Sequence, residues 1–364
     1  MTDARDSAWM ARALRLAERG LYSASPNPRV GCVLVGDGGV VGEGWHERAG
    51  EPHAEIHALR AAGAAARGAT AYVTLEPCSH HGRTPPCADA LIAAGVARAV
   101  VAVQDPNPQV AGQGLAKLRA AGIEVECGLM EADARALNIG FFARMTRGTP
   151  WLRSKIAMSL DGRTALSNGV SQWITGEAAR LDVQRWRARS CAVLTGIGTV
   201  LADDARLNVR EVATARQPLR VVLDSKLRMP LDARVLYGGE NVLIYTATDD
   251  AGKAAVLRDL GVEVVMLPDA EGQVGLAAML RDLAERGVNE VLVEAGSILN
   301  GALLRAGQTD ELVLYIAPQL LGDAARSMAQ LGELNSLDQR VELKWQDVRQ
   351  VGNDLRILVK VEKG

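Results

Sequence analysis

The stretch Pro52-His53-Ala54-Glu55 decides how the first half of the chain folds, together with Glu76-Pro77-Cys78-Ser79-His80-His81-Gly82-Arg83-Thr84-Pro85-Pro86-Cys87. Proline is favoured in the first turn of a helix, because the N–H that it lacks would have no partner there. The first stretch therefore predicts a helix that opens at His53. The second stretch follows a predicted buried strand and ends at Cys87, where another helix is expected to begin.

Outward from these stretches, the first half alternates between strand and helix patterns. Apolar spacing predicts helices over 7–20, 53–66, 88–94 and 114–121, and strands over 30–35, 40–45, 71–75 and 100–103. The turn Asp37-Gly38-Gly39 joins the first two strands in a hairpin. This pattern is typical of a three-layer α/β/α domain with a mixed sheet.

The second half repeats the alternation after the polar segment 144–150, which predicts a domain boundary. Two domains are expected, residues 1–147 and residues 150–364. Strands are predicted over 192–194, 219–223, 242–245, 262–266, 290–293 and 312–316, with helices such as 177–189 and 276–286 between most of them. The tail segments 341–345 and 355–361 predict two strands paired at an edge. We therefore expect an α/β domain with a largely parallel sheet.

The composition excludes several classes of protein. The 364 residues include 41 Lys and Arg against 43 Asp and Glu, so a basic surface for nucleic acid is not expected. Hydrophobic residues make up 48%, as in a folded protein, and aromatic residues only 4%, which disfavours base stacking. The sequence contains neither a secretory signal nor an apolar stretch long enough to span a membrane. The five scattered cysteines favour free thiols in a reducing cytoplasm.

His53, Cys78 and Cys87 form a three-ligand set suited to Zn²⁺. The fourth position of a catalytic zinc is left for water, whose pKa the metal lowers until hydroxide exists near neutral pH. Glu55 can then carry the proton of this water to a leaving amine. The alternative is a closed structural zinc site, with His57, His80 or His81 as the fourth ligand.

The order H-x-E followed by P-C and a second Cys is the signature of zinc nucleobase deaminases. Eight residues separate the two cysteines here, whereas the usual signature has two. The remaining cysteines, Cys32, Cys127 and Cys191, lie in apolar segments and are expected to be buried structural thiols.

Three stretches together resemble the bifunctional riboflavin-biosynthesis deaminase/reductases: Ser25-Pro26-Asn27-Pro28-Arg29-Val30-Gly31-Cys32-Val33, His53-Ala54-Glu55 and the segment 77–87. In that family the longer loop between the cysteines is itself the pattern. The stretches Lys155-Ile156-Ala157-Met158-Ser159-Leu160-Asp161-Gly162-Arg163 and Ser171-Gln172-Trp173-Ile174 resemble its reductase half. The resemblance covers essentially the whole chain.

The resemblance implies a cytidine-deaminase-like first domain and a dihydrofolate-reductase-like second domain. The first domain would hydrolyse the ring amine of a diamino-oxopyrimidine that carries a phosphoribosylamino group. The second would reduce the ribosyl group to ribityl with NADPH. The resemblance also implies one zinc ion per deaminase domain and a homodimer formed through the reductase domain.

The resemblance also implies site residues, and some of them make chemical sense. It assigns the cofactor to Ala157, Trp173, Thr199, Asp203, Ser225, Gly296, Ser297, Ile298, Leu299, Asn300, Gly301 and Ala302, and the substrate of the reductase to Ser171, Arg187, Leu207, Arg210 and Glu294. The segment 296–302 reads as a strand-to-helix turn whose free N–H groups suit pyrophosphate, although an ordinary turn would also tolerate Gly and Ser. Ser225, Lys226 and Arg228 are candidates for the 2′-phosphate of NADPH.

Three residues of the first domain are candidate contacts to its substrate. Asn27, between two prolines, can hydrogen-bond the pyrimidine, and its alternative role is in a turn. His80 and Arg83 lie between the cysteines and can meet the phosphate, unless that loop is a plain solvated surface.

Two other functions compete with the leading one. The first is a zinc deaminase of free or tRNA nucleobases with an accessory nucleotide-binding domain, which leaves the reductase-like half unexplained. The second is a zinc-stabilised nucleotide-sensing module without turnover. Only the enzyme hypotheses predict that Glu55→Ala abolishes deamination while zinc is retained.

Overall fold

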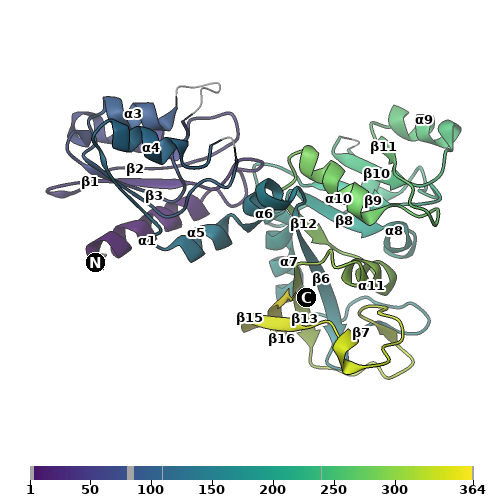
Figure 1. The fold of residues 1–364 in the computed structure, drawn as a ribbon. Helices are drawn as coiled ribbons and strands as arrows, with labels where there is room; N and C mark the ends of the chain where they lie inside the picture. Colours follow the sequence, from purple (N-terminus) through teal and green to yellow (C-terminus); the bar gives the residue numbers. More distant parts are fainter. Residues whose placement is uncertain (1–3, 80–85, 109, 239, 363–364) are drawn as a thin grey trace. The chain divides into compact units, whose positions relative to one another are not determined.

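The first half of the chain folds around a five-stranded sheet in the order β2-β1-β3-β4-β5 (Figure 1). Its strands are β1 (Gly31–Gly36), β2 (Gly39–Trp45), β3 (Thr70–Val73), β4 (Arg98–Val101) and β5 (Glu124–Cys127). β1 pairs antiparallel with both β2 and β3, whereas β3, β4 and β5 pair parallel. The predicted mixed sheet and hairpin are therefore confirmed, with Asp37 and Gly38 as the two-residue turn.

Helices cover both faces of this sheet. They are α1 (Ala4–Glu18), α2 (Ala54–Ala62), α3 (Cys87–Ala93), α4 (Gln113–Ala120), α5 (Glu131–Leu137) and α6 (Ile139–Arg147), and a 3₁₀ turn, η1 (Gly63–Ala66), continues α2. In Figure 1, α1 and α5 lie on one side of the sheet, and α3 and α4 lie on the other. The predicted α/β/α layering is confirmed.

Helix α2 lies directly on β2 because two glycines face it. A Cβ atom built on Gly42 would lie 2.2 Å from the carbonyl oxygen of Ala58, and one on Gly44 would lie 2.4 Å from that of Ala54. Both distances are shorter than any real Cβ contact, so no larger residue fits between strand and helix at this separation. The glycines therefore set the height at which α2, and the His53 at its start, sits above the sheet.

The second half forms a nine-stranded sheet in the order β11-β10-β9-β8-β12-β6-β13-β16-β15. Its strands are β6 (Trp151–Ser159), β8 (Ala192–Gly196), β9 (Leu219–Leu223), β10 (Val242–Thr246), β11 (Glu263–Met266), β12 (Glu290–Val293), β13 (Glu311–Ala317), β15 (Leu343–Val351) and β16 (Asp354–Val361). In this order across the sheet, the seven strands from β11 through β13 all pair parallel with their neighbours. Strand β16 pairs antiparallel with β13, and β15 pairs antiparallel with β16. A largely parallel sheet with the tail strands at one edge was predicted and is confirmed.

The helices of the second half are α7 (Glu177–Arg189), α8 (Ile197–Asp203), α9 (Ala251–Asp259), α10 (Leu276–Glu285) and α11 (Ser297–Arg305). Short 3₁₀ turns, η2 (Arg234–Leu236) and η3 (Leu337–Gln339), and a two-stranded ribbon of β7 (Arg163–Ala165) and β14 (Arg326–Ser327) complete it. The parallel strands lie between two buried apolar clusters, one of which includes Val222, Ile244 and Leu292, and the other Leu194, Tyr245 and Leu283. Both faces of the parallel sheet are therefore buried, as such sheets require.

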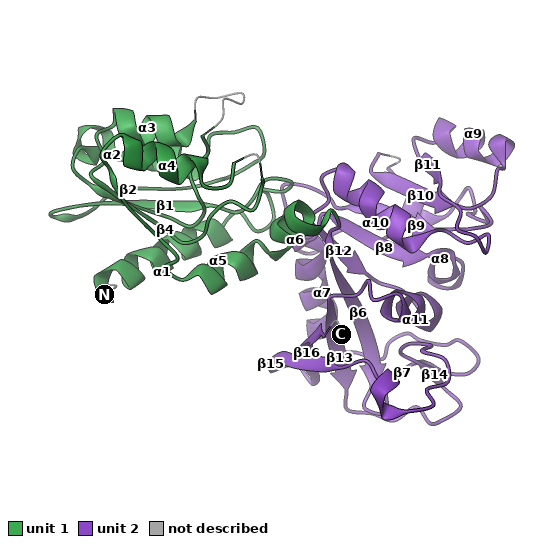
Figure 2. Cartoon of the chain, in the orientation of Figure 1, with its two compact units in different colours: residues 1–148 green, residues 149–364 purple. Residues whose placement is uncertain are grey.

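These coordinates are a computed structural model that describes residues 4–79, 86–108, 110–238 and 240–362. The chain divides into two compact units, Met1–Gly148 and Thr149–Gly364 (Figure 2). Helix α6 runs through Arg147 and so occupies the first part of the polar segment 144–150. Within the described ranges, no helix combines the length and the apolar character that crossing a bilayer requires.

The expectation that all three remaining cysteines are buried is confirmed for Cys32 and wrong for Cys127, while Cys191 is only partly buried. Cys32 is buried in β1, and Cys191 is partly buried beside the start of β8. Cys127 ends the edge strand β5 and is exposed. An edge strand has a neighbour on one side only, so apolar flanking residues do not guarantee burial at its end.

Candidate functional site

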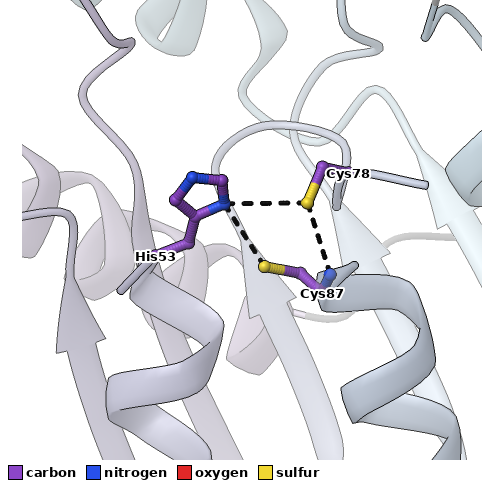
Figure 3. A group of neighbouring side chains, drawn as sticks. All are labelled: His53, Cys78 and Cys87. Carbon is purple, nitrogen blue, oxygen red and sulfur yellow. Dashed lines mark hydrogen bonds between the residues drawn. The ribbon is translucent and has the colours of Figure 1, made fainter. Parts of the chain in front are cut away.

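Three side chains that are far apart in the sequence meet at one edge of the first sheet. His53 immediately precedes α2, Cys78 lies on the segment that follows β3, and Cys87 is the first residue of α3. The Nδ1 atom of His53 lies 3.7 Å from the sulfur of Cys78 and 3.4 Å from that of Cys87 (Figure 3). The candidate ligand atoms all lie within 4.8 Å of one another.

This spacing fits a tetrahedral zinc ion. Zinc binds nitrogen at about 2.0–2.1 Å and sulfur at about 2.3 Å, so at a tetrahedral angle a nitrogen ligand and a sulfur ligand lie about 3.6 Å apart. The two measured N–S distances, 3.7 and 3.4 Å, lie on either side of that value. They also identify Nδ1 as the donor atom of the imidazole, which the sequence pattern alone does not distinguish from Nε2.

A fourth protein ligand is not part of this group where the structure can be described. His57 lies one turn further along α2 and does not belong to the cluster formed by the other three. His80 and His81, the other two candidates for a closed site, lie outside the described residues, as does Arg83. Within the described ranges, the arrangement is that of an open site with three ligands.

Hydrogen bonds around the sulfurs favour a thiolate. The pKa of Cys78 is lowered, first because the Cys87 thiol hydrogen-bonds to its sulfur. The backbone N–H of Cys87, at the start of α3, also donates to this sulfur over 3.3 Å. The same sulfur raises the pKa of His53 by accepting a hydrogen bond from its ring. A thiolate is the form of cysteine that binds metal, so these hydrogen bonds favour metal binding at Cys78.

Glu55 lies next to these ligands as the second residue of α2. Its side chain is buried, at 3% exposure, and burial raises its pKa to about 7. Among the described residues, its Oε2 atom has no hydrogen-bond partner. A carboxylate with a pKa near neutrality and one unsatisfied oxygen is suited to take up and release a proton.

Asn27 is held in one orientation by a histidine that the sequence analysis did not single out. The Nδ1 atom of His46 lies 3.2 Å from the carbonyl oxygen of Pro52, which can only accept, so Nδ1 carries the proton. Burial lowers the pKa of His46, which keeps the ring neutral and its Nε2 an acceptor. The amide nitrogen of Asn27 donates to Nε2 over 3.0 Å. The carbonyl end of the Asn27 amide is therefore left for another partner.

Glu76, just before the Pro77-Cys78 pair, holds a second segment at this edge. Its buried carboxylate accepts hydrogen bonds from the backbone N–H groups of four residues: Asp105, Gly112, Gly114 and Leu115. Two of these N–H groups belong to the first turn of α4, so the carboxylate also caps that helix. One feature of the sequence could have indicated this role of Glu76: it is a charged residue directly after a strand that was predicted to be buried.

In the second unit, most of the proposed cofactor residues lie near the carboxyl edge of the parallel strands. Ala157 is on β6, Thr199 and Asp203 are on α8 after β8, Ser225 follows β9, and the segment 296–302 follows β12. The strands β9, β8, β12 and β6 are consecutive neighbours in the sheet. Ligands of open α/β sheets bind at this edge, so the arrangement suits a cofactor laid across the strand ends.

The proposed substrate residues of this unit centre on a buried ion pair. Arg187, on α7, donates from Nη2 to Glu294 over 2.9 Å and from Nη1 to the carbonyl oxygen of Asn208 over 3.0 Å. Burial favours a raised pKa for Glu294, but the charges of Arg187 and Lys155 lower it overall. Burial lowers the pKa of Lys155, which lies beside this pair on β6. A carboxylate between two cations is thus fixed at the end of β12.

The other proposed substrate residues differ in exposure and in their contacts. The Arg210 side chain is exposed and donates to the Asn208 Oδ1 over 2.8 Å, while its backbone N–H donates to Gln184. Leu207 is buried with φ at +58° in the loop that follows α8. Ser171 is half-buried on the segment between β7 and α7. Of these, only Arg210 offers an exposed charged side chain.

The segment 296–302 separates into an open start and a packed end. Gly296 precedes α11, and Ile298 in its first turn is exposed, so this end of the helix is accessible. Asn300 is buried and donates to the carbonyl oxygen of Ala295 over 3.1 Å. A Cβ atom on Gly301 would lie 2.1 Å from the carbonyl oxygen of Gln330, so this glycine serves a close packing contact. The residues at the start are the better candidates for phosphate contact.

The remaining proposed cofactor residues differ in accessibility. Trp173 is exposed, with the Arg180 guanidinium 4.7 Å from the centre of its ring. Ser225 is half-buried, and its hydroxyl accepts a hydrogen bond from the backbone N–H of Val274 over 3.1 Å. Lys226 and Arg228 are both exposed, so the positive charge expected beside Ser225 is available to a ligand.

Comparisons with known proteins agree with this geometry in both units. Residues 3–103 match the model for the zinc-binding region of cytidine and deoxycytidylate deaminases, and residues 150–357 match that for the RibD C-terminal domain. The riboflavin biosynthesis protein RibD of Escherichia coli is 51% identical, over 96% of this chain and 98% of its own length. A structure of Acinetobacter baumannii RibD is similar with a TM-score of 0.92 and 48% identity, over 99% of both chains. The Thermotoga maritima deaminase/reductase gives a TM-score of 0.87 and 35% identity, over 98% of both chains.

Proposed function

The chain belongs to the RibD family of riboflavin-biosynthesis proteins, and from that premise we propose how its two units divide a two-step reaction. It is a bifunctional enzyme with a zinc-dependent deaminase and an NADPH-dependent reductase. Its substrate is a small pyrimidine nucleotide, which loses a ring amine and then has its ribosyl group reduced to ribityl. We assign the deaminase to residues 1–147 and the reductase to residues 150–364. A deaminase of free or tRNA nucleobases is not favoured, because it leaves the reductase match without a role.

In the deaminase, we assign the zinc ion to Nδ1 of His53 and the sulfurs of Cys78 and Cys87. Zinc held there would supply an acidified water molecule as the nucleophile. Glu55 is placed to take up a proton and deliver it to the departing amine, which its pKa near neutrality supports. Asn27, with its amide orientation fixed by His46, presents a carbonyl acceptor to an N–H of the pyrimidine. The observation that carries this proposal is the three-ligand group beside an unsatisfied buried carboxylate.

In the reductase, we propose that NADPH lies across the carboxyl edge, with its pyrophosphate at the start of α11 and its 2′-phosphate near Ser225 and Lys226. NADPH bound there would supply a hydride to the sugar carbon, a proton would go to the ring oxygen released from it, and the protein would orient the two reactants. Arg210 meets the substrate phosphate with its exposed guanidinium. Arg187 holds Glu294 in place, so that this carboxylate can accept a hydrogen bond from a sugar hydroxyl.

Substitutions in the zinc site test the assignment, because the reductase serves as a control within the same chain. Cys87→Ala should remove zinc and ammonia release, yet leave NADPH oxidation on the supplied deaminated intermediate unchanged. Glu55→Gln should keep zinc at one ion per chain and lower deamination by at least about 100-fold, the usual scale of general acid–base catalysis. Equal loss of both activities in either variant, or a Glu55→Gln enzyme with normal turnover, would refute the assignment.

We also propose a homodimer formed through the reductase unit, in a reducing cytoplasm where the zinc-binding thiols stay free. Strand β15 is last in its sheet, so among the described residues one edge of the sheet has no strand neighbour. It carries apolar side chains that are largely exposed, Trp345 at 68% and Val348 at 56%. Two copies related by a twofold axis would bury them. Light scattering should find a dimer that Trp345→Glu shifts toward monomer, and a wild-type monomer at micromolar concentration would contradict the proposal.

A further inference from the structure

We propose that Asn138 is a positioning residue of the deaminase, which fixes the backbone of Arg29 and, through it, the loop that presents Asn27. The inference rests on the role proposed above for Asn27 and extends it to a residue outside the site. Asn138 lies between α5 and α6, with no place in the signature of the deaminase. Its amide makes two hydrogen bonds to one peptide segment far away in the sequence.

The contact between Asn138 and Arg29 uses both ends of the amide. The Asn138 Oδ1 accepts the backbone N–H of Arg29 over 2.8 Å, and the Asn138 Nδ2 donates to the Arg29 carbonyl oxygen over 2.9 Å. Both residues are buried, and Asn138 is only 2% exposed. The Arg29 guanidinium returns to the same turn by donating from Nη1 to the Leu137 carbonyl oxygen over 2.7 Å. A neighbouring strand would bond to the same backbone N–H and carbonyl groups of Arg29. Here the side-chain amide of Asn138 takes the place of that strand.

The sheet explains why a side chain is used at this point. The last residue pair between β1 and β3 is Cys32 with Val73, after which Thr74 still exchanges hydrogen bonds with Gly31. Beyond Thr74 the chain continues to Cys78 in the metal group, while the segment before β1 continues back to Asn27. Asn138 pairs with Arg29 at the place where the two segments have parted. It thus supplies two hydrogen bonds to the backbone of Arg29, two residues before Gly31.

A displacement of Arg29 is passed on to Asn27 because the intervening residue is rigid. The ring of Pro28 fixes its own φ torsion, which limits how far Asn27 and Arg29 can move independently. The Asn27 amide keeps its orientation through its hydrogen bond to the His46 Nε2, which lies 3.0 Å away. On the opposite side of the segment, the backbone N–H of His46 donates to the Val30 carbonyl oxygen over 2.9 Å. Loss of the Asn138 amide therefore removes the two hydrogen bonds to the Arg29 backbone, while His46 still holds the other side of this segment.

Kinetics of the full-length zinc enzyme test the proposal. Asn138→Ala removes both hydrogen bonds, and Asn138→Asp keeps the size of the side chain but loses the donor. Both variants should raise the KM for the pyrimidine substrate by about 10-fold or more, with kcat within about threefold, because a contact made equally in ground and transition states is weakened. Zinc should stay at one ion per chain, and NADPH oxidation on deaminated intermediate should stay at the wild-type rate.

Tyr72→Phe is the matched control. It removes another buried hydrogen bond of the same unit, from the Tyr72 hydroxyl to Asp6 on α1. This variant should lower the melting temperature of the deaminase unit and leave the KM unchanged. A general loss of stability would raise the KM in the control as well, so the comparison separates positioning from stability.

A double-mutant cycle with Asn27→Ala decides whether Asn138 acts through Asn27. If it does, Asn138→Ala should raise the KM much less in the Asn27→Ala enzyme than in wild type. Equal effects in the two backgrounds, a wild-type KM in both Asn138 variants, or zinc loss together with reductase loss would overturn the inference. A wild-type KM in Asn27→Ala alone would instead overturn the proposed role of Asn27, on which the inference rests.

Discussion

Replacing Gly44 by alanine is a demanding test of how the fold sets the metal site. The added Cβ atom would lie 2.4 Å from the carbonyl oxygen of Ala54 and 2.7 Å from the backbone nitrogen of Ala58, both on α2. Ordinary contacts begin at 3.4 Å. The helix therefore has to move outward by about 1 Å, because backbone atoms cannot rotate away as side chains do.

That movement separates the ligands, because His53 moves with α2 while Cys78 and Cys87 do not. Metal–ligand distances tolerate about 0.2 Å, so we expect zinc affinity to fall by about 10–100-fold. Overpacking should also lower the free energy of unfolding by about 1–3 kcal/mol. Competition for zinc against a chromogenic chelator measures the first effect, and ammonia release with added zinc shows whether Glu55 still reaches the substrate.

Gly38→Ala provides the control, because a Cβ atom there meets nothing within 4 Å in the turn between β1 and β2. It should change neither zinc affinity nor deamination. The reasoning would be refuted if Gly44→Ala bound zinc as tightly as wild type and deaminated at the same rate. Such a result would mean that the glycine is not what sets the separation of α2 from the sheet.

Three further perturbations have definite expected outcomes. Removing zinc with a chelator should abolish ammonia release and leave NADPH oxidation intact, and recovery on adding zinc would exclude irreversible unfolding. Gly301→Ala would place a Cβ atom 2.1 Å from the Gln330 carbonyl oxygen, so thermal melting of the reductase unit should show a loss of about 1–3 kcal/mol, with deamination unaffected. A hydrogen bond from Arg98 lowers the pKa of Asp6 below its ordinary value of 3.8. The Asp6 carboxylate therefore contributes its full stabilisation above pH 3.8, and this contribution is lost as the pH falls through the lowered pKa. Asp6→Asn should therefore lower the melting temperature at pH about 6, by a margin that narrows toward pH about 3; a constant margin would contradict this.

The sequence predicted the chemistry of the metal group better than its geometry. The spacing of His53, Cys78 and Cys87 identified three candidate ligands, because each falls at the end of a recognisable strand or helix. Which ring nitrogen faces the sulfurs depends on side-chain rotation, which no spacing records. The neutral state of His46 depends likewise on burial and on one carbonyl oxygen, that of Pro52.

Tertiary contacts also explain what the sequence predicted wrongly or did not predict. Cys127 was expected to be buried from its apolar neighbours, but its strand is at an edge and its side chain is exposed. Asn138 carries no local signal at all, since its two partners lie on Arg29 at the other end of the unit's sequence.

Each strand of the two large sheets finds its partners within its own unit, β1 to β5 in one and β6 to β16 in the other. Breaking the chain between Gly148 and Thr149 would therefore cut a single peptide bond and no strand pairing among the described residues. The two halves are thus suited to being made as separate polypeptides, and mixing them would show whether the catalytic steps need a covalent tether.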